Sequence, residues 1–199
     1  VGLRGIDVSH HNGNINWKLV RTDKRIQFVY IKASEGASMH DNKYSKNIRK
    51  ARATGLLVGS YHYFNPKVSA SLQFSNFCRA IKNEPQDLIP VVDIEEINGA
   101  TREHICANLQ EMCDLLEQEF GVKPIIYTNR KYYEDLLKPK YSGYKVWIAN
   151  YNRESVKLPA NCVLWQFSSR LRINGFNGRV DGNSLCRGID ELKYSVGKR

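Results

Sequence analysis

Short apolar runs that alternate with longer amphipathic stretches constrain the fold of this chain more than any other feature. Runs of this length without regular polar alternation are typical of strands buried on both faces of a parallel sheet. The stretches between the first five runs can hold helices, whereas the connections beyond residue 151 are short and rich in Gly, Asn and Arg. We expect strands near residues 5–9, 26–34, 56–64, 89–95, 124–128, 145–151, 163–167 and 179–181.

Helix start and stop signals fill the longer stretches. Asp41 or Asn42 can cap one helix that ends at Gly55, and Thr101 can cap the longest helix, which ends at Gly121. We expect helices over about 42–54, 69–83, 102–120 and 130–138.

Five strand–helix units followed by three strands with little helix predict an α/β fold: a single-domain, TIM-like barrel of the (βα)5β3 type over residues 1–199. A doubly wound open sheet is the structural alternative, because strand order is invisible in a sequence. Both folds collect functional groups beyond the carboxyl ends of the parallel strands.

Composition narrows the functional classes. The 199 residues are 42% hydrophobic and carry 30 Lys+Arg against 20 Asp+Glu, a formal net charge of +10. This mixture disfavours a disordered or membrane-spanning chain, and the positive charge favours an anionic partner. A start at Val1 without an apolar leader fits a mature secreted form or a trimmed chain. Five cysteines without CxxC spacing favour small buried side chains over a disulfide framework or a metal site.

Two acidic residues near the end of the fourth predicted strand are the strongest candidates for chemistry. Asp93 and Glu95 point to the same face of an extended strand, with Cα atoms roughly 6–7 Å apart. Two carboxyl groups this close separate their pKa values, so one can donate a proton while the other stays anionic. Such a pair of carboxyl groups can catalyse the cleavage of a glycosidic bond.

Alone, this pair could equally be solvated or belong to a salt-bridge network. Asp7 and Asp181 end two further predicted strands, which would adjoin in a closed barrel, and Glu35 ends a third. Convergence of these acids in a basic protein favours a functional site over an incidental one.

Aromatic residues follow the same strand ends. Sugar rings stack on aromatic faces and donate hydrogen bonds to amides, so such a rim suits an oligosaccharide. Several of these rings can instead fill the barrel, as we expect for Phe28 and Tyr30. The rim candidates are Tyr61, Tyr63, Phe64, Tyr127, Trp147, Tyr151 and Trp165, beside polar His62, Asn65, Asn129, Asn150 and Gln166.

These residues lie in eight segments that resemble, in order, glycoside hydrolase family 25, the lysozymes of the Chalaropsis type. The segments are GIDVSHHNG (5–13), YIKASEG (30–36), GSYHYF (59–64), PVVDIE (90–95), IYTN (126–129), VWIANY (146–151), LWQFSS (164–169) and VDGN (180–183). The resemblance covers almost the whole chain. It implies a (βα)5β3 barrel and a secreted or cell-envelope N-acetylmuramidase that cleaves the β-1,4 bond between N-acetylmuramic acid and N-acetylglucosamine.

Positions carry over one by one from this resemblance. Glu95 matches the catalytic acid/base, and Asp93 matches its partner, which attacks the anomeric carbon or orients the 2-acetamido group of the substrate. Asp7 and Asp181 match two further catalytic-site acids. Substrate-lining positions are matched by Tyr61, Tyr63, Tyr127, Trp147 and Gln166. The resemblance implies no metal and no cofactor, a monomer, and bacterial peptidoglycan as partner.

Other functions stay open at this point. One alternative is a catalytically inactive barrel that binds peptidoglycan or chitin. Another is a metal-dependent polysaccharide deacetylase, in which His10 and His11 join the acids as ligands, although adjacent residues on an extended segment point opposite ways. We expect no nucleic-acid partner, because the chain has no basic helix interleaved with exposed aromatics, and no membrane insertion, because no apolar run is long enough.

Overall fold

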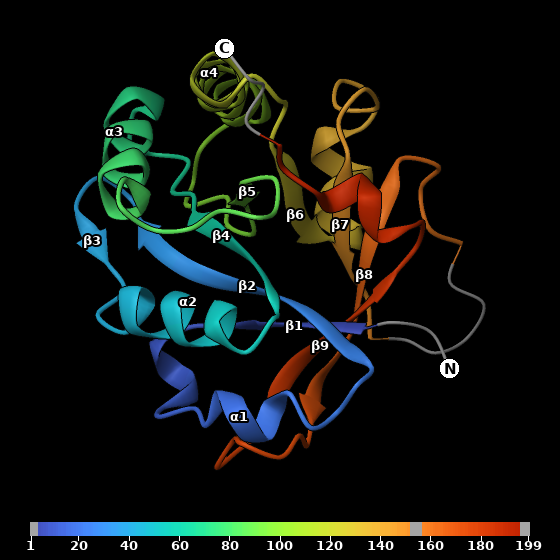
Figure 1. Ribbon diagram of the computed structural model, residues 1–199. Helices are drawn as coiled ribbons and strands as arrows, with labels where there is room; N and C mark the ends of the chain where they lie inside the picture. The colour runs from blue at the N-terminus through green and yellow to red at the C-terminus, as the bar shows by residue number, and fades with distance from the viewer. Residues whose placement is uncertain (1–3, 152–156, 196–199) are drawn as a thin grey trace.

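Pairing between the first two long strands closes the sheet into a barrel. In the computed structural model, which describes residues 4–151 and 157–195, β1 (Arg4–Val8) pairs in parallel with β2 (Ile26–Glu35) and antiparallel with β9 (Val180–Leu185). The barrel order is β1-β9-β8-β7-β6-β5-β4-β2 and back to β1 (Figure 1). The predicted single-domain barrel is confirmed, and the open sheet is wrong. The other barrel strands are β4 (Leu57–Tyr63), β5 (Val91–Asp93), β6 (Ile125–Asn129), β7 (Val146–Ala149) and β8 (Cys162–Leu171). The short β3 (Met39–His40) pairs antiparallel with the end of β2.

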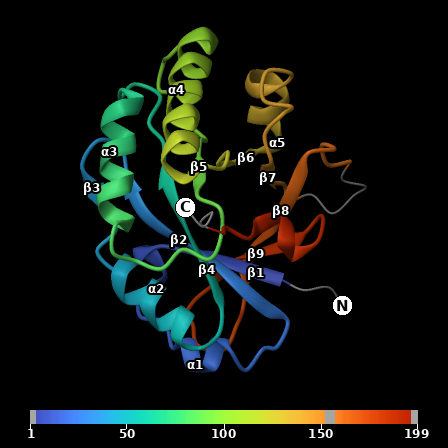
Figure 2. The same ribbon diagram turned by 45° about the horizontal axis from the view of Figure 1, so that its top comes forward.

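Helices cover the outside of the first part of the barrel (Figures 1 and 2). In α4, the Thr101 hydroxyl accepts a hydrogen bond from the His104 amide at 3.2 Å, and Gly121 ends the helix at φ +70°. All four expected helices are present. Their bounds are α2 (Tyr44–Ala53), α3 (Ala70–Ile81), α4 (Arg102–Phe120) and α5 (Arg130–Tyr132), which continues into a π-helical turn, η2 (Tyr133–Leu137); shorter elements are α1 (Trp17–Val20), η1 (His10–Asn12) and η3 (Ile189–Leu192).

The start of α2 differs from the prediction. Lys43 occupies the N-cap position without a side-chain hydrogen bond. The Asp41 carboxylate instead accepts hydrogen bonds from the backbone N–H of His10 and from the Lys43 amide, at 2.8 and 2.9 Å. Asp41 therefore joins α2 to the turn after β1 rather than capping the helix.

Period-two alternation divides the core into an inner and an outer layer. Phe28 and Tyr30 of β2 pack inside the barrel with Trp147, whereas Val29 and Ile31 pack outward under the helices. A Cβ atom at Gly5 would lie 2.1 Å from the Phe28 ring, so β1 needs glycine there. These rings fill the lower part of the barrel. At its upper end, where the parallel strands have their carboxyl ends, the side chains that point into the barrel are polar.

Strand direction in the last third departs from expectation. β9 runs antiparallel to both β8 and β1, so Asp181 stands near the beginning of its strand rather than at a carboxyl end. The short connection from β8 explains this direction, because a parallel neighbour needs a long crossover. The reversal brings Asp181 directly opposite Asp7 in the strand register.

The cysteines are all free thiols. Cys106 and Cys113 are buried in the apolar core, as predicted, while Cys78 is half-buried. The sulfur atoms of Cys162 on β8 and Cys186, just after β9, lie 3.3 Å apart. Within the described ranges, no helix has the length and apolar character to cross a bilayer.

Candidate active site

A cavity of about 490 Å³ opens at the upper end of the barrel. It lies where the parallel strands end, as expected for either α/β architecture. All of the catalytic and substrate-lining residues that the family resemblance implied line it: Asp7, Tyr61, Tyr63, Asp93, Glu95, Tyr127, Trp147, Gln166 and Asp181. The fold therefore brings together side chains that are separated by up to 174 positions, from residue 7 to residue 181.

Asp93 and Glu95 differ sharply in accessibility. Asp93 is the last residue of β5 and is 6% exposed, and its Oδ1 has no hydrogen-bond partner among the described residues. The strand ends there, two residues earlier than predicted, but the Ile94 amide still donates to the Tyr127 carbonyl at 2.9 Å. Glu95 stands beyond the strand and is exposed. One carboxyl group thus lies on the cavity floor and the other at its mouth.

Burial and mutual repulsion keep protons on these acids. Desolvation, followed by the negative charge of Glu95, raises the pKa of Asp93 well above its usual range. Desolvation also raises the pKa of Glu95, although its interaction with Asp93 and the charge of Lys32 oppose this shift. Since the two groups interact closely, they titrate as a pair, and both pKa values lie above those of free carboxyl groups.

Asp7 is held by two amide side chains. Its Oδ2 accepts hydrogen bonds from Gln166 Nε2 at 2.9 Å and from Asn183 Nδ2 at 2.8 Å. Desolvation and the neighbouring charge of Asp181 nevertheless raise the pKa of Asp7 to about 8. Desolvation raises the pKa of Asp181 as well. The second acid pair therefore also resists full ionisation at neutral pH.

The two amides are fixed in turn by aromatic side chains. The hydroxyl groups of Tyr127 and Tyr151 donate to Gln166 Oε1 at 2.8 and 2.7 Å. The Trp147 indole N–H donates to Asn183 Oδ1 at 2.8 Å. Because each amide oxygen accepts and each amide nitrogen donates, the orientation of both amides is determined.

The rim candidates separate by burial. Trp147 and Gln166 are each 2% exposed and form the floor, whereas Tyr151 is 50% exposed at the mouth and reaches Gln166 through its hydroxyl group. Phe64 is buried in the outer core, and His62 is hydrogen-bonded to Ser34 and Gln73 under α3. Alternation along β4 explains this placement, since Tyr61 and Tyr63 face inward.

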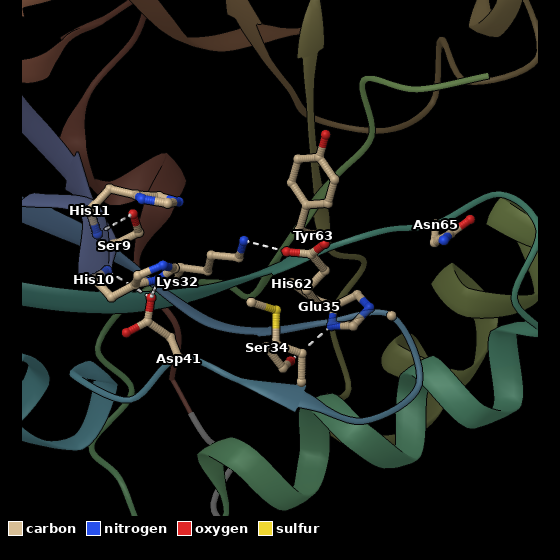
Figure 3. Close-up of polar contacts among 12 residues, drawn as sticks. Ser9, His10, His11, Lys32, Ser34, Glu35, Asp41, His62, Tyr63 and Asn65 are labelled. Atoms are coloured by element: carbon tan, nitrogen blue, oxygen red, sulfur yellow. Dashed lines mark hydrogen bonds and ion pairs between the residues drawn. The ribbon is translucent and has the colours of Figure 1, made fainter. Parts of the chain in front are cut away.

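Lys32 is a site residue that sequence reasoning left unassigned. Its ammonium group lies 2.6 Å from Glu35 Oε2 and 4.9 Å from the centre of the Tyr63 ring (Figure 3). Lys32 is 8% exposed and lines the cavity, where it is the basic group that lowers the pKa of Asp93 and Glu95. The sequence signal that could have identified Lys32 was its spacing, two residues after Tyr30 and four after Phe28, which both face inward. Asn183 was equally detectable, two residues after Asp181.

The two adjacent histidines do not lie on the extended segment expected from the sequence. They lie in the η1 turn with ring centres 3.9 Å apart, and His10 Nδ1 contacts Asp41 Oδ2 at 2.8 Å (Figure 3). His11 lines the cavity and His10 turns to Asp41. In the described ranges, no three His, Cys, Asp or Glu side chains are grouped to hold a metal ion.

Comparisons with known proteins agree with this fold. The model of the family "Glycosyl hydrolases family 25" matches residues 6–176. YegX of Escherichia coli K12, an uncharacterized protein, is 34% identical over 202 residues, covering 98% of this chain and 73% of its own length. An autolytic lysozyme of Clostridium acetobutylicum is 28% identical over 187 residues, which cover 94% of this chain and 57% of that protein. A family 25 glycosyl hydrolase structure from Bacillus anthracis superposes with a TM-score of 0.84 at 29% identity, over 95% of this chain and 91% of that one.

Proposed function

The chain belongs to glycosyl hydrolases family 25 and is a peptidoglycan hydrolase, and from this premise we propose that it is an N-acetylmuramidase with Glu95 as its acid/base. The bond cleaved is the β-1,4 linkage between N-acetylmuramic acid and N-acetylglucosamine. Asp93 is the partner carboxyl group, and the reaction retains the anomeric configuration.

The chemistry follows from the two carboxyl groups. Glu95 protonates the glycosidic oxygen as the bond to the anomeric carbon breaks through an oxocarbenium-like transition state. Either the Asp93 carboxylate or the acetamido oxygen of the substrate, oriented by Asp93, forms the new bond to that carbon. Glu95 then takes a proton from the attacking water, which displaces this group and restores the enzyme.

The position of Glu95 is the observation that carries this proposal. Its carboxyl group has a raised pKa, stands at the mouth of the cavity and is exposed, so a long glycan can reach it without entering the barrel. Asp93 lies below it with an unpartnered oxygen, which can accept the N–H of an acetamido group or attack carbon. Asp7 and Asp181 add to the acidic lining, and Tyr61, Tyr63, Tyr127, Trp147 and Gln166 shape the sugar-binding cavity.

Turnover of purified bacterial cell wall by Glu95→Gln tests the assignment. We expect a loss of about 10²–10⁴-fold, because the amide cannot transfer a proton, with an unchanged circular dichroism spectrum. Asp93→Asn should lose nearly as much, and Asp7→Asn and Asp181→Asn less. Glu103→Gln, the same substitution on the outer surface of α4, is the control and should keep full activity.

Mass analysis of the digest identifies the bond. Products must end in reducing N-acetylmuramic acid; reducing N-acetylglucosamine ends would refute muramidase activity. Normal binding of wall without release of reducing ends would indicate the inactive binding barrel. Near-normal activity of Glu95→Gln would refute its role as the acid.

The remaining properties are parts of the same proposal. The catalytic domain extends over residues 1–199, functions as a monomer without cofactor or metal, and is secreted or held in the cell envelope, where its substrate lies. It neither inserts into membranes nor binds nucleic acid. Size-exclusion chromatography with light scattering and fractionation of the producing cells test the oligomeric state and the location.

A further inference from the structure

A second hollow borders the catalytic cavity at the ends of β6 and β7. This lateral groove has a volume of about 650 Å³ and shares Glu95, Tyr127 and Tyr151 with the catalytic cavity. Its outer wall comes from Asn129 and Arg130 at the start of α5, with Lys131 and Glu134. A substrate whose glycosidic oxygen meets Glu95 therefore lies at the junction of the two hollows.

The two hollows differ in charge. The catalytic cavity is lined by six acidic residues, Asp7, Glu35, Asp93, Glu95, Glu96 and Asp181, and among the described residues that line it Lys32 is the only Lys or Arg. Lys32 is already paired with Glu35. A negatively charged substituent on the substrate would be repelled from this cavity. Such a substituent must therefore extend from the catalytic cavity in another direction.

Arg130 places a positive charge in the wall of the lateral groove. Lys131 is paired with Asp135, and Glu134 is paired with Lys138, so these charges are largely balanced. Arg130 forms no ion pair with any residue in the described ranges, and it is half-buried in the groove wall. A planar guanidinium group presents paired N–H donors that match a carboxylate.

We propose that Arg130 binds a carboxylate of the peptide branch of peptidoglycan and directs that branch into the lateral groove. This inference rests on the proposed muramidase function, because the branch is attached to the muramic acid unit whose glycosidic bond meets Glu95. Arg130 is thus a specificity residue: it favours glycan strands that carry acidic peptides over the same glycan without them.

Kinetics on matched substrates test the proposal. One substrate is soluble glycan with its acidic peptides, and the other is the same glycan after an amidase has removed them. For Arg130→Gln we expect KM to rise about three- to fivefold on the peptide-bearing glycan, with kcat unchanged. On the stripped glycan the variant should equal the wild type. Arg130→Lys should restore part of the affinity, since it keeps the charge but loses the paired donors.

Arg79→Gln, on the exposed side of α3 and outside both hollows, removes the same charge and should change neither KM. An equal loss on both glycans, or no loss on the peptide-bearing one, would overturn the role of Arg130. Failure of the wild type to cleave either glycan would instead refute the proposed function. Wild-type cleavage of both glycans with equal KM would refute only the peptide preference.

Discussion

Asp7 couples the stability of the barrel to the chemistry of its site. The pKa of this group rises from 3.8 to about 8 on folding, because burial and Asp181 disfavour its charge. The folded state therefore binds the proton more tightly than the unfolded state. The resulting stabilisation is complete below pH 3.8, declines as pH rises, and is lost once pH exceeds about 8.

Asp7→Asn should consequently be more stable than the wild type at alkaline pH and less active. The amide keeps an oxygen that can accept from Gln166 and Asn183, but it cannot ionise. Removal of the cost of ionising Asp7, taken as one pKa unit or about 1.4 kcal/mol, should raise the Tm at pH 8.5 by about 3–6 °C. At pH 4 the gain should shrink towards zero. Thermal melts at both pH values measure this, and an equal shift at each would show that ionisation is not the cause.

Lys32 opposes the rise in the pKa values of the catalytic pair. Its positive charge lowers the pKa of Asp93 and of Glu95, so its removal should let both rise. In Lys32→Gln the alkaline limb of the pH–activity profile should move to higher pH, by about one unit or less. Glu35→Gln, which removes the ion-pair partner and frees the ammonium group, should move that limb the other way. Two profiles shifted in the same direction would contradict this assignment.

Residue types and their spacing were enough to predict most of the site. Asp93 and Glu95 share a face through period-two alternation, and Asp7 and Asp181 could be placed at adjoining strands. The hydrogen bonds through Gln166 and Asn183 could not be predicted, because they depend on the register between β1, β8 and β9. The burial of Trp147 likewise depends on how closely Tyr30 and Tyr127 pack against it, 5.2 and 4.8 Å between ring centres.

At the scale of elements, apolar runs and caps predicted the barrel strands and the main helices. They did not predict the direction of β9. Its segment has only a short connection from β8, and the expected strand stopped at residue 181, whereas β9 continues to Leu185. The pattern alone could not reveal that pairing with β1 would extend it. The two-residue β3 was also missed, since it exists only through pairing with the end of β2.

The β8–β9 pair also holds two thiols in contact. Mixing with glutathione disulfide should join Cys162 and Cys186 in a disulfide. The neighbouring Cys162 and Arg187 lower the pKa of the Cys186 thiol. The Cys186 thiolate attacks one sulfur of glutathione disulfide and releases the first glutathione thiol. The Cys162 thiol then displaces glutathione, leaving one protein disulfide and two glutathione thiols. Peptide mapping should find this link, and closure of the intervening loop should raise the Tm by several degrees. Cys186→Ser should show neither change; persistent alkylation of both thiols would contradict the prediction.

At the scale of the whole molecule, the net charge of +10 contrasts with the acidic cavity. Lys18 on α1 and Lys46 and Lys50 on α2 are exposed and form no ion pair within the described ranges. A cationic exterior attracts a wall rich in carboxylates and phosphates while leaving the catalytic acids undisturbed.

Salt should therefore weaken activity on whole walls more than on short soluble fragments, because screening becomes strong as the Debye length falls to about 10 Å near 0.1 M salt. The double variant Lys46→Glu and Lys50→Glu should reduce the salt sensitivity on walls and leave hydrolysis of fragments unchanged. Initial rates across an ionic-strength series measure both. Equal salt sensitivity on walls and fragments would leave the excess charge without this role.

The place of β9 in the chain has a consequence for when activity can arise. Asp181 and Asn183 stand beside Asp7, yet the ribosome adds them after every other described strand. A nascent chain that has been extended only through β8 lacks one wall of the barrel and the partners of Asp7. The chain must therefore be synthesised through β9 before the enzyme can cut a wall.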